Sequence, residues 1–365
     1  MNSQTALRCL VIRGGTSKGL YFLASDLPLD IPTRDAVLLA AMGSPDVREI
    51  DGMGGGHPLT SKVAVVQKSE RDDADVDYLF LQVWPNRAEV SANQNCGNLL
   101  AGVGPFALEE GLLSANDGIT NVRIWMENTQ TLAVAQIQTP GGIVRYVGDA
   151  HIDGVPGASA PIPIEFIDVA GSSCGRLLPT GNVVDVIDGV RVTCIDNGMP
   201  VVCLKAEELG LTGYEEPHEI EANTDVCQKV ERLRLLAGPL MNLGDVTSST
   251  VPKVSLLAPA KNGGVITTRT FIPKSVHEAI GVFGAVSVAT ACLIPGSVAN
   301  EVAGVTGSSS QMTLDIEHPT GYFSVSMDVS IDHGEVIVNS AALLRTARLL
   351  MRGEVFVPTS VWDRK

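Results

Sequence analysis

One lysine stands where a strand pattern begins, and its position suits proton-transfer chemistry. Lys62 closes the segment Pro58-Leu-Thr-Ser-Lys and is followed by the apolar run Val63–Val66. Alternation along a strand places Lys62 on the same face as Ala64 and Val66, so its stem would lie against apolar surface. Partial desolvation lowers the pKa of an ammonium and makes a lysine usable as a general base. The alternative is a lysine whose ammonium reaches solvent at the end of the strand.

Cys96 is the second candidate for acid–base or nucleophilic work. It lies in Asn95-Cys-Gly-Asn98, directly before an apolar helical pattern, and a helix N-terminus stabilises a thiolate. A buried, inert cysteine is the alternative. The remaining cysteines lack such a setting, and no CxxC pair indicates a zinc site or a disulfide framework. These structural candidates are Cys9, Cys174, Cys194, Cys203, Cys227 and Cys292.

Three glycine-rich segments, 13–19, 51–57 and 93–98, lie in the first hundred residues. None has the spacing of a nucleotide-binding loop, and the six histidines lack metal-ligand spacing, so no metal site is expected. Glycine lets the backbone approach a ligand closely and point N–H groups at an anion. Tight turns between strands are the alternative. Polar residues that accompany these segments are Thr16, Ser17, Ser61, Asn95 and Asn98.

Short β-branched runs bounded by Gly, Pro, Asn and Asp predict many strands. They are Cys9–Ile12, Val63–Val66, Tyr78–Trp84, Val122–Met126, Leu132–Gln136, Val190–Ile195, Val201–Leu204, Val254–Leu257, Val265–Thr270, Met312–Glu317, Phe323–Val329 and Val336–Asn339. Helical patterns are fewer: Thr33–Met42, Asn98–Glu110, Val226–Leu236, Val276–Leu293 and Ser340–Met351. Many strands with few helices favour an α+β fold over βαβ alternation.

Two of the predicted helices, 98–110 and 276–293, each follow a turn that contains glycine and are apolar on all sides. A helix of this kind must be enclosed by protein. Two such helices in two strand-rich halves suggest a duplicated unit, each half a curled sheet around one helix. Their N-termini would then face a shared cleft, where free N–H groups hold carboxylates. The alternative is two unrelated buried helices.

Composition limits the classes of function. The chain has 365 residues, 45% of them hydrophobic, which suits two domains and excludes disorder. A net charge of −15 argues against nucleic acid and anionic membranes as partners. The uncharged stretch 279–300 contains Pro295-Gly296, which favours an enclosed helix over a membrane span. The first residues show no secretion signal, so a reduced, cytoplasmic protein is expected.

Several long motifs together resemble one family. They are RGGTSKG (13–19), IDGMGGGHPLTSKVAVV (50–66), NCGN (95–98), IDGVPGASAPI (152–162), LGDVTSSTVPK (243–253) and the terminal GEVFVP. The family comprises 4-oxalomesaconate tautomerases, methylitaconate isomerases and aconitate-isomerising accessory proteins of the methylcitrate cycle, and the likeness covers essentially the whole chain.

The resemblance implies a diaminopimelate epimerase-like fold. This is α+β, with two domains related by a pseudo-two-fold axis, each a barrel-like sheet around a central helix, and an active site between them. We place the border near Gly181-Asn182, which gives an N-terminal domain over 1–182 and a C-terminal domain over 183–365. The last strand is expected to pack back on the first domain.

The same resemblance implies cofactor-free proton transfer on an unsaturated tricarboxylate-like acid. Lys62 matches the family's catalytic lysine, and Cys96 matches its catalytic-site cysteine. Phe283 occupies about the position of the second thiol in the two-base epimerases, and phenylalanine transfers no proton. Where those epimerases have Gly-Asn-Pro-His, this chain has Gly-Met-Pro-Val at 198–201, which suits a substrate without an α-amino group.

The expected ligand is a small anionic di- or tricarboxylate, most similar to 4-oxalomesaconate in the breakdown of aromatic acids such as gallate and protocatechuate. Alternatives are methylitaconate, aconitate, or a non-catalytic accessory role. No metal, cofactor, nucleic acid or membrane is expected as a partner. The protein is expected to form a homodimer or a higher homo-oligomer. Expected substrate-binding residues are Gly15, Thr16, Ser17, Gly54, Gly55, Ser61, Asn95, Gly97, Asn98, Arg269, Gly284 and Ala285.

Overall fold

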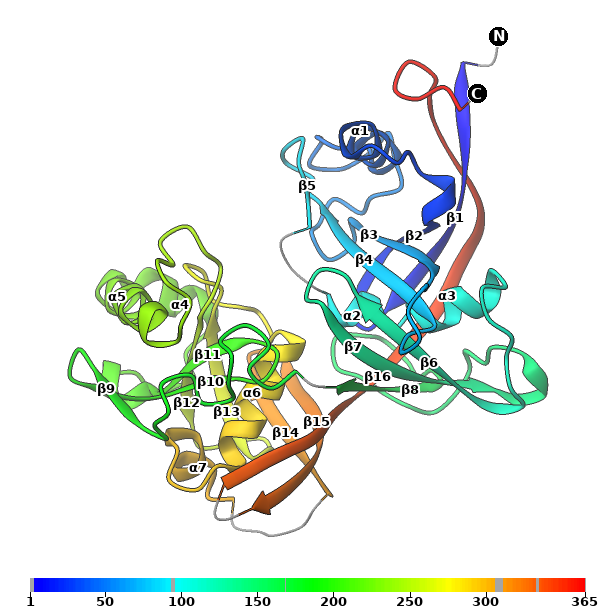
Figure 1. Ribbon diagram of the computed structural model, residues 1–365. Coiled ribbons are helices and arrows are strands. Elements are labelled where there is room, and N and C mark those ends of the chain that lie inside the picture. Colours follow the sequence, from blue (N-terminus) through cyan, green and yellow to red (C-terminus); the bar gives the residue numbers. More distant parts are fainter. Residues whose placement is uncertain (1–2, 93–95, 168, 306–310, 333–334, 365) are drawn as a thin grey trace. The chain divides into compact units, whose positions relative to one another are not determined.

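The computed structural model describes residues 3–92, 96–167, 169–305, 311–332 and 335–364. The chain forms two compact units. Unit 1 comprises Met1–Glu165 together with Leu344–Lys365, and unit 2 comprises Phe166–Leu343. Each unit combines a sheet with a few helices (Figure 1), which confirms the predicted α+β class.

Unit 1 is built on a sheet that closes on itself. Its order is β1, β2, β3, β4, β6, β7, β8 and β16, and β16 pairs again with β1. The strands are β1 (Gln4–Gly14), β2 (Ser17–Leu23), β3 (Lys62–Lys68), β4 (Val76–Val83), β6 (Gly118–Met126), β7 (Thr131–Thr139), β8 (Pro161–Ile167) and β16 (Glu335–Pro358). The short β5 (Val90–Ser91) pairs with β4. β1 and the end of β16 run side by side (Figure 1).

The apolar helix predicted over 98–110 is two short helices, α2 (Gly97–Leu100) and α3 (Val103–Glu109). Pro105 explains the break, because proline has no N–H for the carbonyl four residues earlier and fits only the first turn of a helix. Tyr21 also stabilises the end of α2, since its hydroxyl donates a hydrogen bond to the Leu99 carbonyl. α2 contacts β1 and β2, while α3 contacts β3, β6 and β7, so both lie against the sheet. Helix α1 (Ile31–Met42) packs on a separate apolar cluster of unit 1.

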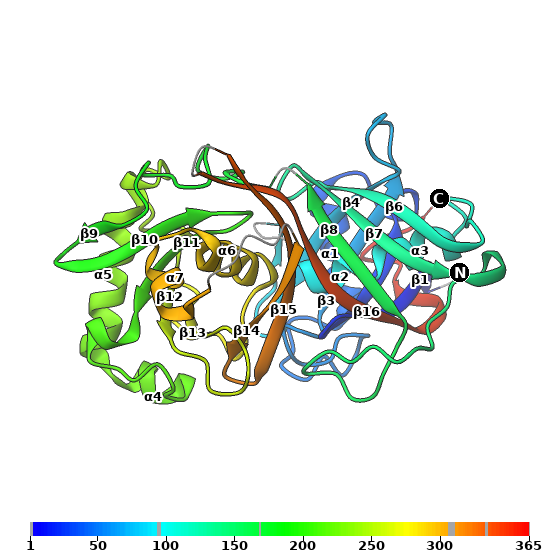
Figure 2. The same ribbon diagram turned by 90° about the horizontal axis from the view of Figure 1, so that it is seen from below.

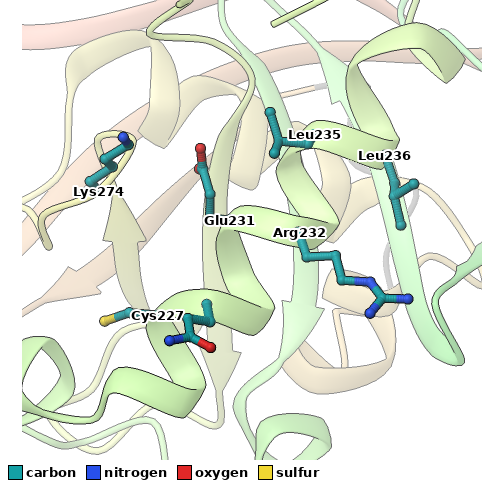
Figure 3. Close-up of a pocket in the computed structure, with 7 residues that line it drawn as sticks. Cys227, Glu231, Arg232, Leu235, Leu236 and Lys274 are labelled. Carbon is teal, nitrogen blue, oxygen red and sulfur yellow. The ribbon is translucent and has the colours of Figure 1, made fainter. Parts of the chain in front are cut away.

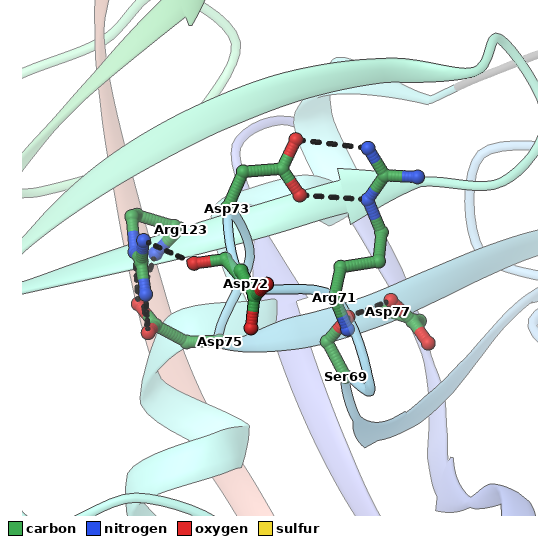
Figure 4. A network of polar contacts seen from close by, with 7 residues as sticks. All are labelled: Ser69, Arg71, Asp72, Asp73, Asp75, Asp77 and Arg123. Carbon is green, nitrogen blue, oxygen red and sulfur yellow. Dashed lines mark hydrogen bonds and ion pairs between the residues drawn. The ribbon is translucent and has the colours of Figure 1, made fainter.

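The turn from β3 to β4 lies at the opposite end of β3 from Lys62 and is rich in acidic residues. Arg123 of β6 reaches the Asp75 carboxylate at 2.7 Å, and Arg71 reaches Asp73 at 2.8 Å (Figure 4). Arg71, Asp73 and Arg123 are exposed and Asp75 is partly exposed, and ion pairs in contact with water stabilise a fold little. They order the turn but do not bear on the chemistry at the other end of the strand.

Unit 2 has an open sheet in the order β9, β10, β11, β12, β13, β14, β15 and the first part of β16. The strands are β9 (Asp185–Ile187), β10 (Val190–Asp196), β11 (Pro200–Lys205), β12 (Lys253–Ala258), β13 (Ile266–Phe271), β14 (Gln311–His318) and β15 (Gly321–Asp332). Helix α6 (Val282–Leu293) contacts β10, β11, β14 and β15 and is buried on nearly all sides (Figure 2). Helices α4 (Pro217–Ala222), α5 (Thr224–Leu240) and α7 (Val298–Ala303) complete the unit.

The border between the units lies at residues 165 and 166, not near 182 as predicted. Segment 169–177 belongs to unit 2 because it is bound to the end of β10. The Asp196 carboxylate accepts from the backbone N–H groups of Ser173 and Cys174, both at 2.8 Å. The Asp196 N–H also donates to the Leu177 carbonyl at 2.9 Å.

The predicted helix at Ser340–Met351 is wrong, because this segment is part of β16. Its Ala, Leu and Arg residues have high helix propensity, but pairing with β15 and then β1 overrides it. Every second residue, Ala341, Leu343, Arg345 and Ala347, is at most 6% exposed, as expected of one face of a strand, and Thr346 on the other face is buried as well. Among the described residues, no helix is long and apolar enough to cross a membrane.

Candidate active site

Lys62 is the first residue of β3 and is buried, with only 7% of its surface exposed. β3 pairs in parallel with β2, where Gly19 lies opposite Lys62. A Cβ on Gly19 would be 2.3 Å from the Lys62 carbonyl oxygen, so this approach requires glycine. On the other side Gln82, 2% exposed, donates to the Ser61 carbonyl at 3.1 Å and to the Pro58 carbonyl at 3.0 Å. The alternative of a lysine that reaches solvent is therefore wrong.

Three side chains distant in the sequence meet at the Lys62 ammonium. Nζ donates to Ser17 Oγ and to Cys96 Sγ, each at 3.1 Å. Ser17 is 1% exposed and Cys96 is 8% exposed. The centre of the Phe80 ring is 5.5 Å from Nζ. An amine, a thiol and a hydroxyl thus meet in one buried cluster, where electrostatic interactions are stronger than in water.

The position of Cys96 is set by α2, of which it is the N-cap. Its Sγ accepts from the Leu99 N–H at 3.5 Å, and its backbone is extended, with φ of −130°. The Tyr78 hydroxyl donates to the Cys96 carbonyl at 3.5 Å. Gly97 is buried inside the short helix. The thiol is therefore held in one orientation, toward Lys62.

The glycine-rich turn 13–19 is fitted against α2. Gly15 has a left-handed φ of 52°, and a Cβ there would be 2.2 Å from Asn98 Oδ1. Asn98 Oδ1 accepts from the Thr16 N–H at 3.4 Å, and the Gly15 N–H donates to the Thr346 carbonyl at 2.9 Å. The turn delivers Ser17 to Lys62. The structure thus brings Gly15, Thr16, Ser17, Gly97 and Asn98 around Lys62 and Cys96, whereas Asn95 lies outside the described residues.

A buried carboxylate, which the sequence did not reveal, supports the second glycine-rich segment. Glu49 is 1% exposed, and its Oε2 accepts from the Ser61 hydroxyl and, at 2.7 Å, from the Gly56 N–H. The Gly55 N–H donates to Ser61 Oγ at 3.4 Å. A Cβ on Gly54 would lie 2.2 Å from the Glu49 carboxylate. Glu49 thus ties the segment that holds Gly54 and Gly55 to Ser61, the residue before Lys62.

We expect Glu49→Gln to lower both stability and activity. A neutral amide makes weaker hydrogen bonds than a carboxylate, and a buried group left unsatisfied costs about 1–3 kcal/mol. A lower melting temperature and a fall in kcat/KM of about tenfold are expected, since the loop before Lys62 loosens. Glu70→Gln, at an exposed position in the same unit, is the control. Unchanged kinetics in Glu49→Gln would show that the loop needs no such support.

The remaining predicted binding residues lie in unit 2. Arg269 of β13 is 6% exposed, and its guanidinium donates to the carbonyls of Glu215 at 2.6 Å and Thr268 at 3.0 Å. Burial lowers the pKa of this guanidinium. Gly284 and Ala285 form the first turn of α6. Contact of these three residues with a substrate stays a prediction.

Phe283, at the position expected of a second thiol, is packed into the core of unit 2. Its ring centre is 4.5 Å from that of Phe166. A Cβ on Gly198 would be 2.4 Å from the Phe283 ring, so the two are in tight contact. A side chain without a transferable proton fills this position, and the expectation against two-base epimerisation stays a prediction.

A hollow of about 560 Å³ lies along α5 in unit 2 (Figure 3). Cys227, Glu231 and Leu235 of α5 line it together with Lys274. Glu231 is already paired with Arg234, 2.7 Å away. The hollow therefore offers no acid–base pair comparable with Lys62 and Cys96.

Within the part of the chain that the structure describes, no cluster of three or more His, Cys, Asp or Glu residues could hold a metal ion. All seven cysteines lie in this part, and none forms a disulfide. Burial raises the pKa of the thiols of Cys9 to about 11 and of Cys194 and Cys292 to about 12. These three cysteines are buried core residues, and their structural role stays a prediction.

Two isomerases are similar to this chain over nearly its whole length. The chain is 62% identical over 349 residues to a (4E)-oxalomesaconate Delta-isomerase of Novosphingobium sp. (strain KA1), which covers 96% of this chain and 97% of the relative. It is 57% identical over 359 residues to a 4-oxalomesaconate tautomerase of Pseudomonas putida (strain KT2440), with 98% of each chain covered.

Solved structures of other proteins also resemble this chain. A methylitaconate-delta-isomerase matches 100% of this chain and 98% of its own with a TM-score of 0.86 and 34% identity. A hydroxyproline epimerase from Agrobacterium vitis, at 14% identity and a TM-score of 0.53, shares the fold alone. The epimerase-like fold predicted from the sequence is therefore confirmed. The PrpF protein family matches residues 4–358, and the chain belongs to this family of isomerases.

Proposed function

We propose that the protein isomerises 4-oxalomesaconate by proton transfer, with Lys62 as the base. The observation that carries this proposal is the buried contact of Lys62 Nζ with Cys96 Sγ, at 3.1 Å. Identities of 62% and 57% to proteins named for oxalomesaconate support this substrate over methylitaconate. The solved methylitaconate isomerase is only 34% identical.

The reaction begins when the Lys62 amine removes a proton from an allylic carbon that is flanked by a carbonyl or carboxylate. The electron pair of the broken C–H bond delocalises into the conjugated system and gives a dienolate. Neighbouring donors stabilise the developing charge, and each such donor is worth about 10²–10³ in rate. The Ser17 hydroxyl, which lies 3.1 Å from Nζ, serves as such a donor.

A proton then returns to a different atom and gives an enol or a shifted double bond. Cys96 is suited to deliver it, because the thiol is in hydrogen-bond contact with the amine that took the first proton. This leaves Lys62 as an ammonium and Cys96 as a thiolate, and a proton that passes from Nζ to Sγ across their 3.1 Å contact restores the amine and the thiol for another turnover. An acid–base group placed in this way contributes about 10²–10⁴ in rate.

The proposal extends to the setting of the reaction. We assign the protein to the breakdown of aromatic acids such as gallate and protocatechuate, in the cytoplasm, without a cofactor, as a homo-oligomer. The acidic charge of −15 means that local donors, rather than the field of the whole molecule, must attract a tricarboxylate.

The test is a solvent-exchange assay on the purified protein after dialysis against a metal chelator. In deuterated water, incubation with 4-oxalomesaconate should change its ultraviolet spectrum and incorporate deuterium into the substrate carbon skeleton. Methylitaconate and aconitate, assayed in parallel, should react far more slowly. Absence of exchange with all three acids would contradict the proposal and favour a non-catalytic accessory role.

A further inference from the structure

Arg345 lies on β16, where this strand runs past the glycine-rich turn 13–19. In the ladder between β1 and β16, Gly14 is opposite Ala347, and one residue further the Gly15 N–H donates to the Thr346 carbonyl. Arg345 is therefore next to the turn that carries Ser17.

The register also shows which way the Arg345 side chain faces. A Cβ on Gly14 would be 2.5 Å from the Asn98 carbonyl oxygen, so this face of β1 points toward α2. Ala347 shares that face as the partner of Gly14, and Arg345, two residues along the strand, shares it too. Cys96, the N-cap of α2, lies on the same side.

Arg345 is 6% exposed, which is unusual for an arginine. Its Nη1 donates to the Leu344 carbonyl at 2.9 Å. Burial lowers the pKa of this guanidinium to about 9, while a negative charge at Cys96 raises it. The cation is thus electrostatically linked to the thiol that contacts Lys62.

A second arginine nearby faces away. Arg13, one residue before Gly14 on β1, uses its guanidinium for the Thr346 hydroxyl at 2.8 Å and Ser159 Oγ at 3.1 Å. Thr346 is on the opposite face of β16 from Arg345. Arg13 is therefore committed to holding β16 against β1 and the segment before β8.

We propose that Arg345 is the residue of unit 1 that binds a carboxylate of the substrate and so places the reacting carbon at Lys62. A guanidinium can take a carboxylate with two parallel hydrogen bonds, which fixes direction as well as position. This inference rests on the proposed function, since it assumes a polyanionic substrate at Lys62 and Cys96. It supplies the local cation that a protein with excess negative charge needs for such a ligand.

The experiment measures binding and turnover separately. Tricarballylate, a saturated tricarboxylate that cannot isomerise, is titrated calorimetrically into the wild-type protein, Arg345→Gln, Arg345→Lys and Arg348→Gln. Arg348 is exposed on the opposite face of the same strand and serves as the control. We expect Arg345→Gln to bind tricarballylate about 10²-fold more weakly, because one partner of a buried charged contact is lost. Arg345→Lys keeps the positive charge but cannot make two parallel hydrogen bonds, so its affinity for tricarballylate should lie between those of the wild type and Arg345→Gln. Arg348→Gln should bind like the wild type.

Kinetics with 4-oxalomesaconate should show a raised KM in Arg345→Gln with a smaller change in kcat. Near-ultraviolet circular dichroism checks folding, and if the glutamine variant is unfolded, Arg345→Lys alone decides. Wild-type affinity for tricarballylate in the folded Arg345 variants would overturn the inference, as would absence of binding by the wild-type protein. If tricarballylate binding depends on Arg345 but 4-oxalomesaconate is not converted, the proposed function fails and the carboxylate site stands.

Discussion

Lys62→Ala should lower kcat by about 10²–10⁴-fold, the usual contribution of a positioned acid–base group. The Lys62 amine contacts both the Ser17 hydroxyl and the Cys96 thiol, and we propose it as the base. Alanine removes the amine that takes the substrate proton, so deuterium incorporation should fall in parallel with turnover. A stopped ultraviolet assay and mass spectrometry of recovered substrate measure the two.

Lys68→Ala is the matched control, because Lys68 is on the same strand and exposed. It should keep wild-type kcat and KM. Small primary amines added to Lys62→Ala should restore part of the activity if the lost function is that of a base. Near wild-type turnover in Lys62→Ala, with folding intact, would show that Lys62 is not the base.

Local pattern was sufficient for much of this site's framework. The strand that begins at Lys62 follows from its apolar run, and β1, β4 and β12 follow from β-branched residues between turns. The predicted helix at 340–351 is wrong because strand pairing with distant parts of the chain overrides the local helix propensity. For the same reason the sequence did not single out Arg345, which lies in this segment. Nothing in the residue types of this segment, which favour a helix, indicates that one of its arginines is buried.

The meeting of Lys62 with Cys96 could not be derived from local pattern, since 34 positions separate them. It depends on the parallel pairing of β2 with β3 and on the packing of α2 against β1 and β2, both of which are tertiary effects. The resemblance to a family supplied the pair, but not Glu49 or Gln82. Glu49 accepts from the Ser61 hydroxyl and Gln82 donates to the Ser61 carbonyl. No motif with a fixed spacing in the sequence marks supporting contacts of this kind.

Cys96→Ser should lower kcat by about 10²–10³-fold, within the range of a lost acid–base contribution, with KM changed only a few-fold. Serine keeps a hydroxyl where the thiol was and can still cap α2, so the site stays assembled. A hydroxyl is a far weaker acid than a thiol, however, and returns a proton slowly. Cys227→Ser, at a half-exposed position in α5, is the control and should keep wild-type kinetics.

The ratio of exchange to turnover assigns the second proton step. If Cys96 returns the proton, Lys62 still removes one in Cys96→Ser, and the dienolate has time to recapture deuterium from the ammonium. Exchange into recovered substrate should then persist while product formation falls, so the ratio rises at least tenfold. Equal losses of both would mean that Lys62 performs both transfers, with Cys96 confined to holding the ammonium in place. Because Nζ and Sγ are already in contact, the two outcomes differ in chemistry rather than in geometry.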